Sequence, residues 1–209
     1  GSNYIAGVKT DANKVRLIPF SFSITQNYIL EFGNTYFRVY KDNGQVLDSG
    51  SAVEGATPYL TAELFDLKFC QSADTLYVAH INHAPRKITR SSHTSWSVTT
   101  ISFTSAPSNF AGSAGEYPGA VSFFEERLWW GGSTDNPQTV WASKSGDFEN
   151  MTQGSDADHS LEYTLAASQV NVIKWLAASP NGLIIGTVGG EFVATGGGDP
   201  ITPTSIQIN

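Results

Sequence analysis

The sequence is poor in cysteine, with Cys70 the only one among 209 residues. An intrachain disulfide and a cysteine-based zinc site are therefore both excluded. A catalytic cysteine needs a partner that lowers its pKa, whereas Cys70 ends the apolar stretch Leu67–Cys70. We interpret it as a buried structural thiol.

Long hydrophobic runs and clustered basic residues are also lacking. The longest apolar runs, such as Val121–Phe124 and Leu128–Trp130, span a few residues, whereas a membrane helix needs roughly 18–20. We therefore expect no membrane span. The net charge of −7, from 19 acidic and 12 basic residues, argues against a nucleic-acid binder that relies on a basic patch. A hydrophobic content of 40%, with 12% aromatic residues, excludes a disordered chain.

We do not interpret the first residues as a signal peptide. We interpret Gly1 and Ser2 as a cloning scar. Asn3–Ala6 is not followed by the apolar core of a signal peptide, and no basic region precedes one. We expect the sequence to be a fragment of a longer protein.

Helix signals are weak, and strand signals dominate. The 20 glycines and 9 prolines interrupt every candidate helix, and the best helical turn is the short segment Thr61–Asp66. The remaining apolar segments are short runs of β-branched and aromatic residues, which predict strands. Hairpin turns are predicted at Gly33-Asn34, Asn43-Gly44, Asn181-Gly182 and Gly189-Gly190, because these residues reach positive φ at low cost.

The predicted hairpins repeat along the chain. A leucine in the second strand of each unit recurs about every 50 residues, at Leu30, Leu76, Leu128 and Leu183. Each such strand is preceded by one apolar run and followed by two further strand candidates. Four strands at this period are typical of β-propeller blades, which cover one another's faces.

The sequence thus predicts an all-β, propeller-like domain of four-stranded antiparallel blades. We assign one domain to residues 1–209, with approximate blades at 3–50, 65–104, 118–167 and 170–209. A β-sandwich or two small barrels would also give many short strands and stay as alternatives.

The histidines and the acidic loop are the first candidates for a metal site. His80 and His83 stand three residues apart, which in a strand would point them to opposite faces and would suit a metal only in a turn. His93 lies in a polar turn and is interpreted as a solvated loop residue. The loop Asp156–His159 could offer carboxylate oxygens to calcium, but it lacks the ligand series of an EF-hand, so a solvated loop is favoured.

The remaining motifs also favour structural roles. Glu125 and Glu126 are adjacent, so on a strand they face opposite ways, and we interpret them as a turn rather than an acid–base pair. The glycines at 189–190 and 196–198 are not followed by the Lys-Ser or Lys-Thr of a phosphate-binding loop. Asn150-Met151-Thr152 matches a glycosylation sequon without any sign of secretion. We expect no catalytic, cofactor-binding or metal-ligating residues.

The segment Trp141–Asn150 resembles the Asp-box hairpin of sialidase propellers. In that motif the aspartate satisfies turn backbone groups and does no catalysis. We expect Asp147 to accept local N–H bonds and Phe148 to anchor the turn in the core. We also expect the tryptophan strands to be core: Trp129 and Trp130 should face opposite neighbours, and Trp141 and Trp175 should be buried.

An ordered set of segments resembles the nozzle or hub proteins of short-tailed phage tails, the tail tubular protein B-like or phage stabilization family. Each segment is a weak motif alone, but together they run in order from about Lys14 to Ile208. The segments are Lys14–Phe22, Tyr28–Gly33, Arg38–Tyr40, Gln71–Tyr77, Pro85–Ile88, Arg127–Leu128, Thr139–Ser143 and Gly146–Phe148.

The resemblance implies a non-enzymatic virion structural protein, made in the bacterial host cytoplasm and assembled into the tail. It implies a propeller region in which identical subunits form a ring, usually sixfold, around the DNA-ejection channel and contact other tail proteins. DNA would pass without tight binding, which the negative net charge favours. The alternatives are a carbohydrate-binding or glycan-processing propeller and a general interaction scaffold of host origin.

Overall fold

The structure is a computed structural model that describes residues 4–166 and 170–209, and strands are the regular secondary structure of this part. The all-β prediction is confirmed there. The proposed cloning scar at Gly1 and Ser2 lies outside the described residues, as do the ends of two predicted blades, Asn3 and Ala167. The described part contains no helix that could cross a membrane.

The predicted helical turn at Thr61–Asp66 is not a helix. Glu63 N–H donates to the Leu60 carbonyl (2.9 Å) and Asp66 N–H donates to the Glu63 carbonyl (3.0 Å), which makes two successive turns. The Glu63 carboxylate also accepts from Leu60 N–H at 2.9 Å. The segment is too short to repay helix nucleation, so local turn bonds dominate.

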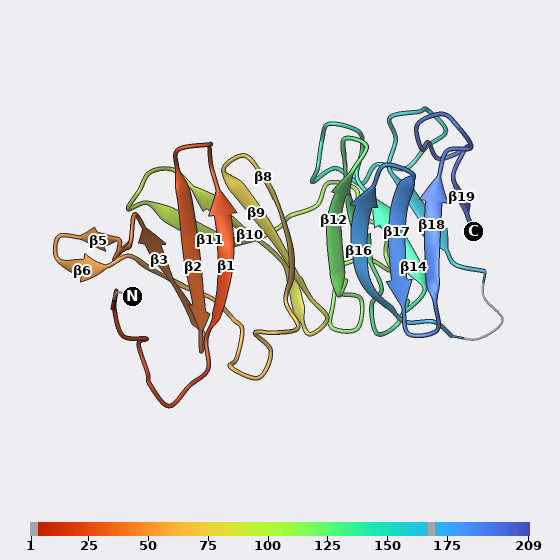
Figure 1. Cartoon of the computed structure of the whole chain (residues 1–209). Helices are drawn as coiled ribbons and strands as arrows, with labels where there is room; N and C mark the ends of the chain where they lie inside the picture. The colour runs from red at the N-terminus through yellow and green to blue at the C-terminus, as the bar shows by residue number, and fades with distance from the viewer. Residues whose placement is uncertain (1–3, 167–169) are drawn as a thin grey trace. The chain divides into compact units, whose positions relative to one another are not determined.

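Four antiparallel sheets follow one another along the chain, and within each the main path of strands follows chain order (Figure 1). The first contains β1 (Arg16–Ser21), β2 (Asn27–Gly33), β3 (Tyr36–Lys41) and β4 (Gly44–Gln45), with β7 (Glu54–Ala56) also paired to β3. The second contains β8 (Lys68–Ser72), β9 (Thr75–His80), β10 (His83–Arg90) and β11 (Trp96–Thr100). The third contains β12 (Ala120–Phe124), β13 (Arg127–Gly131), β14 (Thr139–Ala142) and β15 (Leu161–Thr164). The fourth contains β16 (Ile173–Ser179), β17 (Gly182–Thr187), β18 (Glu191–Thr195) and β19 (Gln207–Ile208).

The repeating leucines lie on the second strand of each sheet. Leu30, Leu76, Leu128 and Leu183 fall in β2, β9, β13 and β17, and each is fully buried. The outer edge of the first sheet differs from the expected single fourth strand. Two short strands, β4 and β7, share the partner strand β3, and a separate hairpin of β5 (Leu47–Asp48) and β6 (Ser51–Ala52) lies between them in the chain. The strand β7 therefore lies beyond residue 50, where the first predicted blade ends.

Three of the predicted hairpin turns are wrong by one residue. In the turn after β16, Ser179 pairs with Gly182, so Pro180 and Asn181 form the loop. Gly33 pairs with Tyr36, so the loop residues are 34 and 35, and the ring of Tyr36 occupies the space that a Cβ of Gly33 would need. The glycine is required for this close approach rather than for the turn. Lys41 pairs with Gly44, so Asp42 and Asn43 form the next turn, with φ of 52° and 60°.

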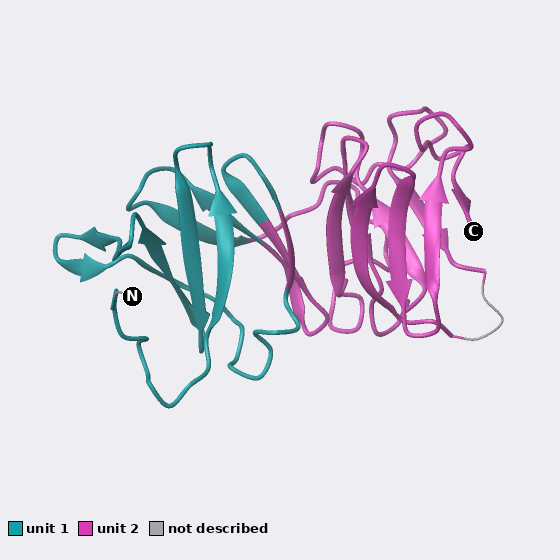
Figure 2. Ribbon diagram, in the orientation of Figure 1, with its two compact units in different colours: residues 1–67, 71–76, 87–99 teal, residues 68–70, 77–86, 100–209 magenta. Residues whose placement is uncertain are grey.

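The chain divides into two compact units (Figure 2). Unit 1 comprises residues 1–67, 71–76 and 87–99, and unit 2 comprises residues 68–70, 77–86 and 100–209. The division passes through strands of the second sheet. Within unit 1, Trp96 packs edge-on against Phe20 (4.8 Å between ring centroids), Tyr28 (5.3 Å) and Phe37 (6.3 Å).

Within unit 2, the third sheet is covered on both faces. Adjacent strand residues point to opposite faces, and Trp129 and Trp130, both fully buried, lie in two different hydrophobic clusters. Trp129 shares its cluster with Leu176 and Leu183 of the fourth sheet, while Trp130 shares its cluster with Tyr77 of β9. The expected opposite directions of these two tryptophans are thus confirmed. The strands β12 and β16 lie against each other (Figure 1).

Trp141 is fully buried as expected, but the expectation for Trp175 is wrong. Trp175 is 36% exposed, whereas its neighbour Leu176 takes the buried face of β16. A bulge separates Ile173 from Trp175, and the indole lies over Gly186 of the paired strand. The bulge and the missing side chain of Gly186 place the ring on the outer face of the fourth sheet.

Candidate functional site

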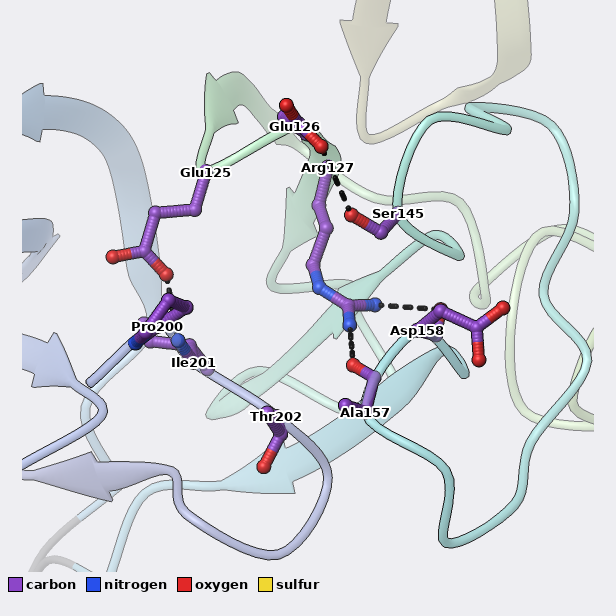
Figure 3. A pocket seen from close by; sticks show the side chains of 9 residues that line it. All are labelled: Glu125, Glu126, Arg127, Ser145, Ala157, Asp158, Pro200, Ile201 and Thr202. Carbon is purple, nitrogen blue, oxygen red and sulfur yellow. Dashed lines mark hydrogen bonds between the residues drawn. The ribbon is translucent and has the colours of Figure 1, made fainter.

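A cavity of about 490 Å³ in unit 2 lies at the hairpin between β12 and β13 (Figure 3). Its wall is built by the turn Glu125–Arg127, by Ala157 and Asp158, and by the segment Pro200–Thr202. This volume is within the range of small-molecule sites. Its chemistry depends on which polar groups are available to a ligand.

Arg127 lies at the back of this cavity and is 2% exposed. Its guanidinium donates to the main-chain carbonyls of Ser143 (2.7 Å), His159 (2.6 Å) and Ala157 (2.5 Å). Burial lowers the pKa of Arg127, and the nearby carboxylates of Asp158 and Glu125 oppose this shift. The arginine thus joins its own strand to two loops through hydrogen bonds that leave it little capacity for a ligand.

Glu125 and Glu126 form the turn that the sequence predicted. Both have left-handed backbone conformations, with φ of 46° and 57°, as a tight hairpin turn requires. The Glu125 carboxylate accepts from Ile201 N–H at 2.7 Å, and the Glu126 carboxylate accepts from the Ser145 hydroxyl at 3.5 Å. Figure 3 shows the two carboxylates pointing in different directions. They do not form a pair for acid–base chemistry.

Side chains of the acidic loop Asp156–His159, beside this cavity, form an ion pair and a hydrogen bond with other groups of the protein. Asp158 forms an ion pair with Lys144 at 2.9 Å, and the hydrogen bond from this lysine lowers the pKa of Asp158. His159 Nδ1 accepts from Asp156 N–H at 3.1 Å. One ligand atom from each of these two aspartates and His159 lies within 4.8 Å of the others, so the geometry would admit a cation. The loop bonds favour the solvated-loop interpretation.

The other histidines take different places. His80 ends β9 and His83 begins β10, so a turn separates them and the argument from a continuous strand does not apply. Their rings are 5.2 Å apart, and His80 Nδ1 accepts from Asn82 N–H at 3.2 Å. His93 is exposed as expected, but its Nδ1 also lies 2.5 Å from the Tyr28 hydroxyl.

The turn that follows β14 contains Asp147 and Phe148. Phe148 packs as expected, but Asp147 bonds a different group. Phe148 packs edge-on against Phe123 at 4.8 Å, which confirms the anchor. The Asp147 carboxylate accepts from the Asn150 side-chain amide at 3.0 Å, not from a turn N–H. The buried Ser143 hydroxyl accepts from Leu128 N–H at 3.0 Å and ties the two strands together.

Cys70 is partly buried and packs against the cluster that contains Trp130. Burial raises the pKa of its thiol. A thiol held in this neutral form is a poor nucleophile, in agreement with the structural interpretation.

Sequence reasoning did not single out Arg127, which lines the cavity, or Ser143, which accepts hydrogen bonds from Arg127 and from Leu128 N–H. One signal was present: Arg127 is a charged residue that opens a run of apolar residues continuing as Leu128-Trp129-Trp130. A charge in such a strand is buried only where it is fully hydrogen-bonded. The carbonyls that bind it come from loops up to 32 residues away in sequence, which the sequence alone does not pair with it.

Comparison with known proteins adds no family. No protein-family model matches the sequence, and the search of curated proteins found no similar protein.

Proposed function

We propose that this chain is a non-enzymatic structural component of a phage tail, in the nozzle or hub ring around the DNA-ejection channel. The observation that carries the proposal is the succession of four antiparallel sheets, each with its main path of strands in chain order, on an ordered set of segments that resembles this family. A protein that works by assembly needs a rigid scaffold rather than a reactive site. The side chains of Arg127, Glu125 and Asp158 already form hydrogen bonds or an ion pair with other groups of the protein, which agrees with that role.

We further propose that the sheets are propeller-like blades. Two features of unit 2 support this arrangement. The third sheet is covered on both faces, and the first strands of consecutive sheets, β12 and β16, lie against each other. In a propeller, the first strand of each blade lines the axis, and each face packs on a neighbouring blade.

In the virion the subunits would form a ring, sixfold by the resemblance, in which each touches the next through unlike surfaces. The ring would also contact other tail proteins. Its negative charge would let DNA pass without tight binding, because phosphate contacts need clustered lysine and arginine.

Localisation of the full-length protein in virions tests the proposal. An affinity-labelled protein should appear in electron micrographs at the tail, and label confined to the capsid or absent from purified virions would overturn it. Mobility-shift measurements with duplex DNA at physiological salt should show no stable complex. Tight, salt-dependent binding would contradict the role as a passive conduit.

The enzyme alternative is tested separately. The chain should not turn over glycans or simple esters above background. Turnover that is lost in Asp147→Asn, Glu125→Gln or Glu126→Gln would make the glycan-processing interpretation the better account.

A further inference from the structure

Unit 1 contains a small cavity, of about 250 Å³, beside Trp96 at the start of β11. Its other walls come from Thr94, from Asp48 and Ser51 of the β5–β6 hairpin, and from Glu54 at the start of β7. In the chain, this hairpin lies between β4 and β7, the two short outer strands of the first sheet. The proposed structural role makes no use of these residues.

The indole of Trp96 is held in a fixed orientation. Its N–H donates to the His93 carbonyl at 3.0 Å, and its ring packs edge-on against Phe20 and Tyr28 at 4.8 and 5.3 Å. The side chain is nevertheless only partly buried and lines the cavity. An indole that is held in place by its neighbours and lines a cavity offers a preorganised apolar surface to a ligand.

The rim around this platform is polar and accessible. Asp48, Ser51, Glu54 and Thr94 are all exposed, and together they supply two carboxylates and two hydroxyls. The Glu54 charge is compensated by ion pairs with Lys9 and Arg38. The Asp48 carboxylate accepts from the neighbouring Ser49 hydroxyl at 3.4 Å, a long hydrogen bond that leaves most of its acceptor capacity open.

We propose that this cavity binds a single pyranose ring of a glycan, either neutral or bearing an amino group. A pyranose has an apolar C–H face that stacks on an aromatic ring and equatorial hydroxyls that carboxylates and hydroxyls bind at its edge. The volume lies below the roughly 300 Å³ of drug-sized ligand sites, which suits one ring rather than several. The Asp48 carboxylate, which has no ion pair of its own within the described part of the chain, disfavours sugars that carry a carboxylate, because like charges would face each other.

The same groups argue against a purely apolar ligand. Such a ligand would remove water from the Asp48 carboxylate without replacing its hydrogen bonds, which is costly. A ligand with several hydroxyls replaces that water. The specificity therefore depends on the combination of the Trp96 ring with the acidic rim.

Saturation-transfer NMR with simple methyl pyranosides tests the proposal on the whole chain. The panel contains neutral hexosides, an amino-hexoside, and a glucuronide and sialoside as acidic probes. We expect saturation of ring C–H protons for a neutral or amino sugar, with an affinity on the order of millimolar. Asp48→Asn and Trp96→Phe should each weaken binding at least about tenfold, which corresponds to a loss of about 1.4 kcal/mol.

Asp11→Asn is the matched control, because it removes one exposed carboxylate outside the cavity and should leave binding unchanged. Circular dichroism verifies the fold of each variant. Three outcomes would overturn the proposal: no saturation of any sugar, preference for the acidic sugars, or equal weakening in Asp11→Asn. Each can occur whether or not the protein is found in phage tails, so this test and the localisation test fail independently.

Discussion

Arg127 connects three segments of unit 2 through a single side chain. Its guanidinium is buried and donates to main-chain carbonyls of the loops at 143 and 157–159. Hydrogen bonds from a charged donor contribute more than neutral ones, and unpaired buried carbonyls carry a desolvation cost. This residue therefore stabilises the cavity wall more than any of the exposed carboxylates near it.

Replacement of Arg127 should destabilise the protein strongly. Arg127→Ala should lower the free energy of unfolding by about 3 kcal/mol or more, and Arg127→Lys should restore only part of this because an ammonium lacks the planar set of donors. Urea unfolding followed by tryptophan fluorescence measures the difference. The control is Lys144→Met, which removes only the exposed ion pair with Asp158 and should cost about 1 kcal/mol or less. Equal losses in Arg127→Ala and Lys144→Met would contradict the argument.

The tryptophans offer a second comparison at the residue scale. Trp130 is fully buried, whereas Trp175 is 36% exposed on the outer face of its sheet. Trp130→Ala should therefore cost roughly 3–5 kcal/mol, while Trp175→Ala should cost about 1–2 kcal/mol. Thermal and chemical unfolding of the two variants in the same buffer measure which substitution costs more stability. A Trp130→Ala variant that keeps the wild-type melting temperature would show that the cluster around this ring does not support the fold.

At the scale of elements, the β12–β13 turn stores backbone strain in two glutamates. A left-handed conformation costs an L-residue about 1–2 kcal/mol, which glycine avoids. Glu126→Gly should stabilise the protein by about 0.5–1 kcal/mol after the entropy cost of glycine, because Glu126 has only a 3.5 Å bond to Ser145. Glu125→Gly should instead destabilise by about 1 kcal/mol, since it loses the 2.7 Å bond to Ile201. Chemical unfolding measures the change in the free energy of unfolding for both variants. A change of the same sign in both would contradict the expected difference between the two glutamates.

The first sheet carries a buried carboxylate shared by two tyrosines on β3. Glu31 is 3% exposed and accepts from the hydroxyls of Tyr36 (2.8 Å) and Tyr40 (2.7 Å). Burial, together with the hydrogen bond to Glu31, raises the pKa of Tyr36 from its ordinary value of 10.0 to about 12. The same two causes raise the pKa of Tyr40.

This pairing predicts a loss of stability in alkali. Because the folded pKa of Tyr36 is raised, its stabilising contribution is complete below pH 10 and is lost as the pH rises towards about 12. Unfolding measured across this interval should show stability falling with pH, and Tyr36→Phe should reduce the slope. Glu31→Gln should lower the midpoint of phenolate absorbance, because burial then acts without the carboxylate. A midpoint unchanged in Glu31→Gln would show that the carboxylate does not contribute.

The elements also show which features a sequence of this kind predicts. The β12–β13 turn was predictable because two glutamates interrupt two apolar runs, and the leucine period found the second strand of every sheet. The turn after β2 was misplaced by one residue because Gly33 serves the ring of Tyr36 rather than the turn. The turn after β3 was misplaced because Asp42 and Asn43 take the left-handed conformations, while Gly44 pairs with Lys41. Trp175 was misassigned because a bulge in β16 changes the face on which its ring lies.

At the scale of the whole molecule, the two units interleave along the chain. Unit 2 takes residues 68–70 and 77–86 from the second sheet as well as everything from residue 100 onward. Tyr77 and Ala79 of β9 belong to the hydrophobic cluster around Trp130. A break at residue 100 would therefore divide one hydrophobic cluster, even though most of unit 2 lies beyond it.

Two fragments test this organisation. The fragment 100–209 lacks Tyr77 and Ala79, so the cluster around Trp130 should lose part of its cover, although Phe103 and Phe110 still pack against the ring. We expect it to bind a hydrophobic dye such as anilinonaphthalene sulfonate and to melt without a cooperative transition. The fragment 68–209 contains Tyr77 and Ala79 again, so it should unfold cooperatively and bind less dye per molecule than the fragment 100–209. Cooperative unfolding of 100–209 with no dye binding would mean that the third and fourth sheets suffice as a core, and that β9 contributes no necessary cover.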